Sequence, residues 1–325
     1  MPTFYTRKKN RKKFDYYDKD VKVTDQTIIE RINALVIPPA WKDVLIAKTK
    51  SAKVQATGKD SAGRTQAIYH PAFRAAQEQK KFNRLIEFGR KLPALREQVK
   101  QDMAKQSLTK EKVLATIVHL MDEAYFRVGN ESYARNNQSY GVTTLRRRHT
   151  SIRTTAVTFD FIGKSGKRQQ KTIKNRRFAR IMQQLDELPG HEVFQYLDAD
   201  GHKHSITSSD VNAYIKENMG TDFTAKDFRT WGGTLIATAS LANSKEMSQK
   251  GRNKAIVQSV KDVAKQLGNT PAVARSSYID PRILDTFLKT DTLADFNNAV
   301  AHMKADPFFK PTEKATLNIL KQYKK

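Results

Sequence analysis

The hydrophobic pattern changes near residue 80, and this change constrains the fold more than any other feature of the chain. Between residues 21 and 75, short apolar runs such as 44–47 (VLIA) and 53–57 (KVQAT) alternate with turn-forming sequences such as 58–64 (GKDSAGR). This is the pattern of strands joined by tight turns. After residue 80, apolar residues recur at helical spacing. The order predicts an α+β protein in which a small β-rich domain precedes a mainly α-helical one.

A β-hairpin is predicted within the helical part. Residues 157–162 (VTFDFI) and 169–173 (QQKTI) are strand-like, and the glycine-bearing segment 163–168 (GKSGKR) lies between them. An amphipathic helix is predicted from Phe82 past Pro93, and a second helix follows Thr109. Further helices are predicted around residues 178–188, 210–218, 230–242, 253–267, 283–288 and 312–324.

The length of 325 residues is sufficient for two domains. Residues 7–13 (RKKNRKK) carry six positive charges in seven residues, which is typical of a solvated arm. We therefore predict a basic flexible arm over residues 1–20, a β-rich domain over 21–80 and a larger domain over 81–325.

The charge balance indicates an anionic partner. The chain has 59 Lys and Arg against 33 Asp and Glu, which gives a net charge of +26, and 38% of its residues are hydrophobic. A disordered polycation would have far fewer apolar residues, and a folded protein with this charge needs an anionic partner. We therefore expect a folded protein that binds nucleic acid. The lack of cysteine excludes disulfides, Cys-ligated metals and thiol catalysis. No apolar run is long enough for a membrane span or a secretion signal, so we expect a cytoplasmic protein, associated with the nucleoid if bacterial.

Several apparent ligand motifs are incomplete. Residues 163–165 (GKS) resemble the end of a phosphate-binding loop, but the glycine required five positions earlier is replaced by Thr158, so no nucleotide cofactor is expected. Residues 198–201 (DADG) open like a calcium loop but lack its remaining acidic ligands, which favours a β-turn. His202 and His204 alternate as on a strand, and we expect no carboxylates near enough to complete a metal site.

A dispersed set of basic and polar motifs carries a family resemblance. In the larger domain, the motifs are 127–131 (RVGNE) with 140–145 (YGVTTL), 161–166 (FIGKSG), 226–231 (KDFRTW), 267–270 (LGNT) and 277–281 (SYIDP). In the small domain, residues 55–66 are followed by Tyr69, His70 and Pro71. With these motifs in order and at family-like separations, the sequence from about residue 30 to about residue 290 resembles the type IB DNA topoisomerases of the compact bacterial and poxvirus-like branch.

The resemblance implies a reaction and assigns roles to five residues. Tyr278 would attack a DNA phosphodiester, forming a 3′-phosphotyrosyl bond and freeing a 5′-hydroxyl. Arg127 and Arg229 would bind the non-bridging oxygens, and Lys164 would protonate the leaving oxygen. Asn269 stands where much of the family has histidine, and we expect it to act as a neutral hydrogen-bond donor. The reaction would need neither metal nor ATP.

The resemblance also implies how DNA is held. Residues 21–80 and the catalytic domain over 81–325 would form a C-shaped clamp around duplex DNA, and the protein would be a monomer. Tyr140, which precedes Gly141, could equally pack in the core. The implied DNA contacts are Gln66, Tyr69, Tyr133, Tyr140 and Lys226.

Two other functions remain open at this point. A tyrosine recombinase shares the catalytic fold and the Arg, Lys, Arg, Tyr plan, but recombinases typically carry histidine three residues before the second arginine, where this chain has Lys226 before Arg229. A non-enzymatic nucleic-acid-binding protein would explain the charge, although it would leave the five ordered motifs unexplained.

Overall fold

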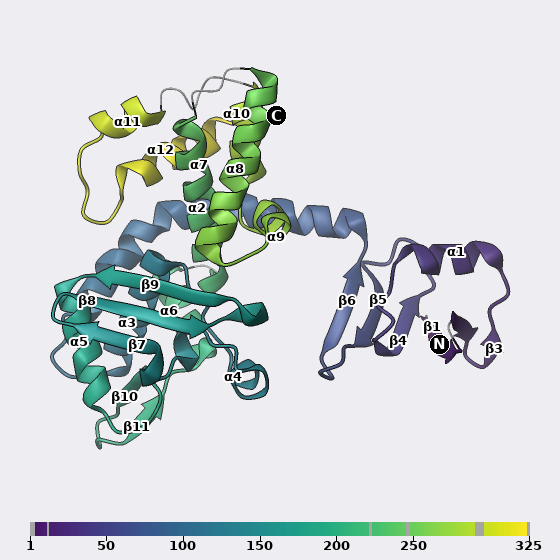
Figure 1. Ribbon diagram of the computed structural model, residues 1–325, viewed down its shortest axis with the longest axis horizontal. Coiled ribbons are helices and arrows are strands. Elements are labelled where there is room, and N and C mark those ends of the chain that lie inside the picture. Colours follow the sequence, from purple (N-terminus) through teal and green to yellow (C-terminus); the bar gives the residue numbers. More distant parts are fainter. Residues whose placement is uncertain (1–3, 12, 221–222, 245–247, 290–295, 324–325) are drawn as a thin grey trace. The chain divides into compact units, whose positions relative to one another are not determined.

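The computed structural model describes residues 4–11, 13–220, 223–244, 248–289 and 296–323, and the chain forms two compact units, residues 1–81 and 82–325 (Figure 1). The boundary between the units falls within helix α2 (Pro71–Asp102). The β-rich first unit and the mainly helical second unit confirm the predicted α+β class. No helix among the described residues has the length and apolar character that a membrane crossing requires.

The first unit is built on one antiparallel sheet of six strands in the order β3-β2-β1-β4-β5-β6. Besides the start of α2, the described part of this unit contains the helix α1 (Gln26–Ala34), which is capped by the carboxylate of Asp25 and buries Ile32. The sequence prediction missed this helix. The strands are β1 (Phe4–Asn10), β2 (Lys13–Asp18), β3 (Val21–Lys22), β4 (Lys42–Ala47), β5 (Val54–Lys59) and β6 (Thr65–Tyr69).

The basic N-terminal segment is part of this sheet, so the prediction of a flexible arm over residues 1–20 is wrong for the described residues. Strands β1 and β2 pair antiparallel, with Lys9 opposite Phe14. The Arg7 guanidinium lies 4.2 Å from the centroid of the Phe14 ring and donates to the carbonyls of Ile37 and Trp41. Cross-strand pairing and aromatic contacts therefore order a segment whose charge alone suggested disorder.

The second unit is mainly helical and contains two small antiparallel sheets. One sheet has the order β7-β8-β9, and the predicted hairpin is confirmed by pairing of Ile162 with Arg168 across its turn. The elements are α3 (Lys110–Ala124), α4 (Glu131–Asn137), β7 (Thr150–Arg153), β8 (Ala156–Ile162), β9 (Arg168–Lys174), α5 (Arg176–Glu187), β10 (Gln195–Leu197), β11 (Lys203–Ser205), α6 (Ser208–Met219), α7 (Ala225–Ala242), α8 (Gln249–Leu267), α9 (Pro271–Ser277), α10 (Pro281–Lys289), α11 (Phe296–His302) and α12 (Pro311–Gln322).

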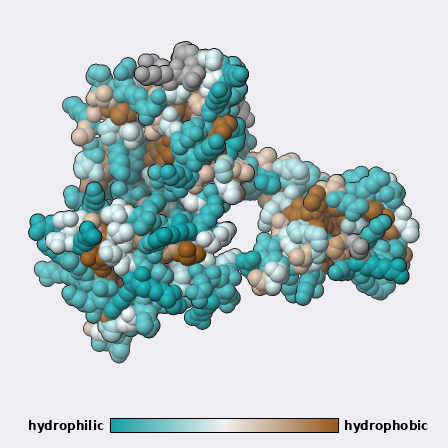
Figure 2. All heavy atoms as spheres, in the orientation of Figure 1, coloured by the Kyte–Doolittle hydropathy of each residue, from teal (hydrophilic) through white to brown (hydrophobic). Residues whose placement is uncertain are grey.

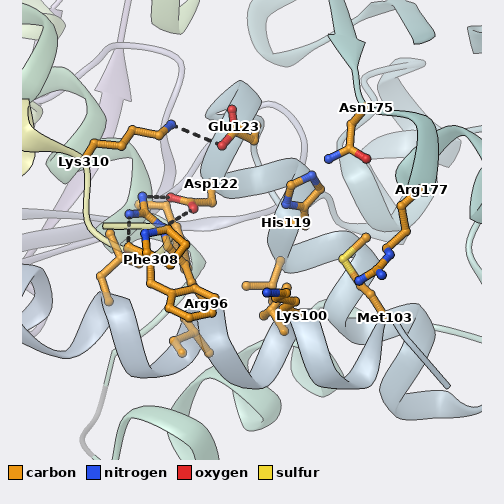
Figure 3. A pocket seen from close by; sticks show the side chains of 16 residues that line it. Arg96, Lys100, Met103, His119, Asp122, Glu123, Asn175, Arg177, Phe308 and Lys310 are labelled. Atoms are coloured by element: carbon orange, nitrogen blue, oxygen red, sulfur yellow. Dashed lines mark hydrogen bonds and ion pairs between the residues drawn. The ribbon is translucent and has the colours of Figure 1, made fainter. Parts of the chain in front are cut away.

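Helix α7 lies in the core of this unit, and a buried ion-pair network joins it to other helices. Arg96 of α2 forms ion pairs with Asp122 of α3 and Glu313 of α12, and Trp231 of α7 donates to the same Glu313. The carboxylates thus satisfy a charge that would otherwise be costly to bury. A cavity of about 430 Å³ lies beside this network, with Lys100 and His119 among its lining residues (Figure 3). On the face shown in Figure 2, hydrophilic residues cover most of the surface and apolar patches are small.

Candidate active site

Tyr278 lies at the end of α9, where the backbone is held on both sides. Its N–H donates to the Ala274 carbonyl at 3.0 Å, and the N–H of the buried Asp280 donates to Thr234 of α7 at 3.1 Å. Gly233 of α7 lies against the same segment, since a Cβ there would be 2.5 Å from the Tyr278 carbonyl oxygen. The backbone of Tyr278 is therefore fixed against α7, while its side chain is half-buried.

Arg229 of α7 is a buried cation that contacts the ring of Tyr278. Its side chain is 3% exposed, and its guanidinium carbon lies 5.0 Å from the centroid of the Tyr278 ring. The guanidinium donates to the carbonyl of Leu267, the last residue of α8, at 2.8 Å, and to the carbonyl of Tyr125 beyond the end of α3. Carbonyls at helix C-termini carry partial negative charge, so two helix ends hold this arginine in place.

Arg127 lies in the loop between α3 and α4 and reaches the same region through Asn269. Its guanidinium donates to the Oδ1 atom of Asn269, in the loop between α8 and α9. The Arg127 carbonyl accepts from Val142 at 2.9 Å. A Cβ at Gly141 would lie 2.5 Å from the Cα of Gly129, so the two loop segments approach as closely as glycine permits.

Two buried donors at this site have no partner among the described residues. They are the Nε of Arg229 and the Nδ2 of Asn269. Buried polar atoms without a partner are uncommon in folded proteins, and a catalytic role or a bound ion is one of their known explanations. One donor belongs to the Arg229 guanidinium, and the other belongs to the Asn269 amide, whose Oδ1 atom accepts from Arg127. A group with anionic oxygens, such as a phosphate, therefore fits the site chemically.

The site carries uncompensated positive charge. Among the described residues, neither Arg127 nor Arg229 forms an ion pair. Burial lowers the pKa of Arg229 to about 10, and the charge of Arg127 acts in the same direction. Burial alone would raise the pKa of Tyr278, but the charges of Arg229, Arg127 and Lys226 outweigh it and bring that pKa below its ordinary value. The arrangement therefore favours the phenolate, which is the nucleophilic form of tyrosine.

Lys164 is exposed at the tip of the β8–β9 hairpin, and within the described chain no hydrogen bond or ion pair joins it to Tyr278 or the arginines. A different lysine of the same turn contacts the site, since the Nζ of Lys167 donates to the Asn269 carbonyl at 2.9 Å. Gln169 of β9 also lies against Gly268. The sequence prediction missed Lys167, although the second lysine of the GKSGK turn was an available signal.

The predicted DNA contacts lie in different environments. Lys226 is exposed in the first turn of α7, one turn before Arg229, and Tyr133 is exposed on α4. In the first unit, Tyr69 is exposed at the end of β6, and the amide of Gln66 donates to Asp60 at 2.9 Å. Four of the five predicted contacts are therefore at least partly exposed to solvent.

Tyr140 differs from the other predicted contacts because it is 6% exposed. Its hydroxyl accepts from Arg148 at 3.1 Å, and its ring packs against His149 with the centroids 4.4 Å apart. These contacts favour the packing role that the sequence left open.

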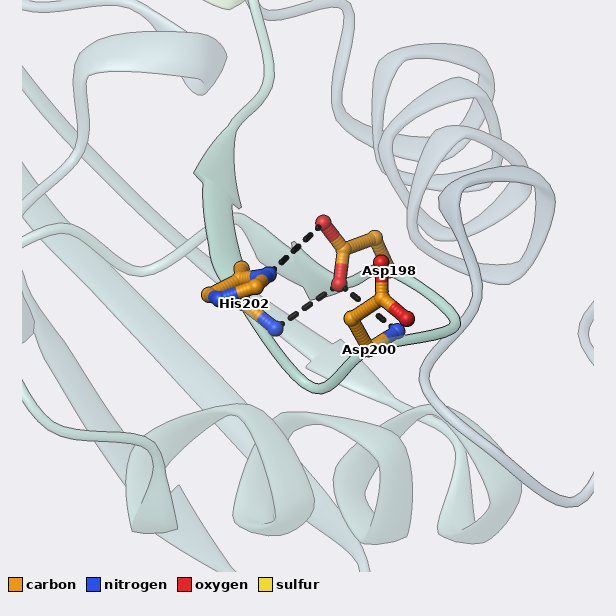
Figure 4. Close-up of side chains that lie close together, drawn as sticks. All are labelled: Asp198, Asp200 and His202. Atoms are coloured by element: carbon orange, nitrogen blue, oxygen red, sulfur yellow. Dashed lines mark hydrogen bonds and ion pairs between the residues drawn. The ribbon is translucent and has the colours of Figure 1, made fainter.

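The predicted turn at residues 198–201 is present between β10 and β11. The expectation that no carboxylate lies near His202 and His204 is wrong, as Figure 4 shows for His202. Ligand atoms of Asp198, Asp200 and His202 lie within 4.8 Å of one another, and His204 is 2.7 Å from the Asp198 carboxylate. The Asp198 carboxylate also accepts from the backbone N–H groups of Asp200 and His202. Its oxygens therefore already have the partners that a tight turn requires.

Models of two known protein families match the chain. Residues 70–304 match the catalytic core of eukaryotic DNA topoisomerase I, and residues 13–60 match the N-terminal domain of bacterial DNA topoisomerase IB. The chain belongs to the type IB DNA topoisomerase family. The family is one of isomerases that act on DNA, so the recombinase and the non-enzymatic alternatives are not favoured.

Individual members of the topoisomerase family align over most of the chain. The chain is 36% identical to DNA topoisomerase 1B of Acanthamoeba polyphaga mimivirus, over 98% of this chain and 95% of that protein. It is 22% identical to DNA topoisomerase 1B of Vaccinia virus (strain Copenhagen), over 78% of this chain and 76% of that protein. A shorter match to DNA topoisomerase 1 of Mycosarcoma maydis, at 24% identity, covers 56% of this chain and 20% of that protein.

Proposed function

We propose that this protein relaxes supercoiled duplex DNA by breaking and rejoining one strand, with Tyr278 as the nucleophile. The observation that carries the proposal is the contact between the Tyr278 ring and the buried guanidinium of Arg229. In the cleavage step, the Tyr278 oxygen bonds to phosphorus and the bond from phosphorus to the 5′-oxygen breaks. The phenolic proton passes to solvent, and the products are a 3′-phosphotyrosyl ester and a 5′-hydroxyl strand.

The neighbouring donors would stabilise the transition state. Negative charge grows on the non-bridging oxygens as phosphorus becomes five-coordinate, and Arg127, Arg229 and the Nδ2 of Asn269 can bind those oxygens. Lys164 would donate a proton to the leaving 5′-oxygen. Because Lys164 is exposed at the hairpin tip, we propose that bound DNA draws the tip toward the leaving group.

Religation reverses these steps. The 5′-hydroxyl attacks the phosphotyrosyl ester, so the energy of the original linkage is conserved and no ATP is required. Arg127 and Arg229 would balance the negative charge that grows on the non-bridging oxygens. We propose that a single chain therefore acts without metal or nucleotide. Between the two steps, rotation of the free strand releases supercoils.

Both units would contribute to DNA binding. The net charge of +26 favours contacts to phosphates that weaken steeply as salt rises and carry little sequence information. Gln66 and Tyr69 of the first unit, and Tyr133 and Lys226 of the second, are the proposed contacts. We place the protein with its substrate, in the cytoplasm or at the nucleoid.

Incubation of supercoiled plasmid with the protein, in EDTA and without ATP, tests this function. We expect a ladder of relaxed topoisomers, because neither a metal nor a nucleotide takes part. A recombinase would give recombinant products only from plasmids with paired sites. A protein that only binds DNA would shift the plasmid in a gel and leave its linking number unchanged, and that result would contradict the proposal.

Replacement of Asn269 tests the neutral-donor role. In Asn269→Ala, the Arg127 guanidinium loses its acceptor and the site loses the unpartnered Nδ2 donor. We expect single-turnover cleavage and religation to slow by about 10- to 100-fold, the range that corresponds to losing a hydrogen bond to a charged group. Rates equal to those of the wild type would show that the amide takes no part.

A further inference from the structure

Lys171 is a half-buried lysine on β9, seven residues beyond Lys164. Its Nζ donates to the carbonyl of Ala124, the last residue of α3. The same ammonium lies 5.6 Å from the ring centroid of Tyr125 and 5.7 Å from that of Phe126. The side chain therefore joins the hairpin sheet to the C-terminal end of α3.

The segment that Lys171 contacts is under conformational constraint. Tyr125 follows α3 in the left-handed region, with φ of 55°, which costs energy for a residue with a side chain. A Cβ at Gly232 of α7 would be 2.3 Å from the Tyr125 ring, so the ring lies directly against that helix. Such a backbone conformation persists only where surrounding contacts hold it.

The same segment supports both arginines of the candidate active site. The Tyr125 carbonyl accepts a hydrogen bond from Arg229, whose guanidinium lies over Tyr278. Arg127 follows only two residues later in the chain. A displacement of the end of α3 would therefore move the carbonyl that orients one arginine and the backbone that carries the other.

We propose that Lys171 is a positioning residue for the reaction: by holding the Ala124 carbonyl and the Tyr125 ring, it fixes Arg229 and Arg127 relative to Tyr278. It also couples the arginines to the strand that leaves the Lys164 turn. The proposal rests on the proposed function, in which those residues bind and attack the phosphate.

The surroundings of Lys171 make this contact sensitive to pH. Burial, together with the smaller effect of the Arg229 charge, lowers the pKa of Lys171 to about 8. The ionisable groups that face it are Arg229 of α7 and Tyr125, which follows the end of α3. On β8, the residue opposite Lys171 is the apolar Phe159. As the pH rises through this pKa, the amine loses its charge and with it the cation–π attraction to the two rings.

Single-turnover cleavage of a duplex oligonucleotide at saturating DNA tests the proposal. We expect Lys171→Met to slow cleavage by about 10- to 100-fold with unchanged DNA affinity, as a small misplacement of catalytic groups does. Lys171→Arg keeps a permanent charge and should restore most of the rate. Because the wild-type pKa is about 8, the ratio of the wild-type rate to the Lys171→Arg rate should fall as the pH rises from below to above that value. Lys174→Met, on an exposed lysine of the same strand, is the control and should cleave normally.

The pKa of Tyr278 gives a second readout that does not depend on cleavage. Difference titration against Tyr278→Phe should show that Lys171→Met raises this pKa, because Arg229 is no longer held over the ring. Wild-type cleavage rates together with an unshifted Tyr278 pKa in Lys171→Met would overturn the inference. If the wild type itself fails to cleave, the proposed function is wrong, and the Tyr278 titration still decides whether Lys171 positions Arg229.

Discussion

We expect Tyr278→Phe to abolish DNA cleavage and plasmid relaxation and to leave DNA binding intact. The change removes only the hydroxyl that would bond to phosphorus, while the ring remains under Arg229 and the backbone stays held against α7. The expected loss is about 10⁴-fold or more in the single-turnover cleavage rate, which is the scale of removing a nucleophile. Gel-shift titration should give an affinity within about twofold of the wild type, since phosphate contacts dominate binding.

Tyr196→Phe is a matched control for this experiment. Tyr196 lies on β10 of the same unit, and its ring stacks on His204, with 5.2 Å between the centroids. Loss of its hydroxyl should leave cleavage unchanged. Relaxation that persists in Tyr278→Phe would contradict the assignment of the nucleophile.

Arg229→Lys is expected to have the second largest effect, and it should change both rate and stability. The guanidinium donates to two carbonyls, those of Tyr125 and Leu267, and still has an unpartnered Nε. A lysine is a point charge without the planar fork, so it cannot serve both helix ends and a phosphate together. We expect cleavage to fall by about 10²- to 10³-fold, as for the loss of one transition-state donor.

The change in stability distinguishes the hydrogen bonds of the Arg229 guanidinium from a general requirement for positive charge at this position. Leaving a buried carbonyl without a donor costs about 1–3 kcal/mol, so the free energy of unfolding from urea denaturation should fall by that amount. Arg180→Lys, on an exposed position of α5, is the control and should change neither quantity. Wild-type cleavage in Arg229→Lys would show that this arginine has a structural role alone.

Local patterns in the sequence predicted much of the second unit. The hairpin follows from two strand-like runs around a glycine-bearing turn, and Thr109 caps α3 as expected. Spacing could not place Arg127, Arg229, Asn269 and Tyr278 together, because they come from three loops and a helix that meet only in the folded chain. Their grouping was predicted from the ordered motifs of the family resemblance instead.

The wrong and missed predictions arise mostly from contacts between segments that the sequence pattern does not reveal. The basic segment near Arg7 was predicted to be an arm because composition does not reveal a cross-strand partner such as Phe14. Helix α1 was missed although Asp25 precedes apolar residues at helical spacing. Lys167 and Lys171 were missed because their contacts depend on how the hairpin packs against the loop after α8 and the end of α3.

Isolation of the covalent complex is the most direct test of the central claim. Plasmid is incubated with the protein in EDTA, the reaction is stopped with denaturant, and the nucleotide-bearing peptide is identified by mass spectrometry after digestion of DNA and protein. The account predicts one modified peptide, with the phosphate esterified to Tyr278. A modification on another residue, or an adduct that forms only when a divalent ion is added, would contradict it.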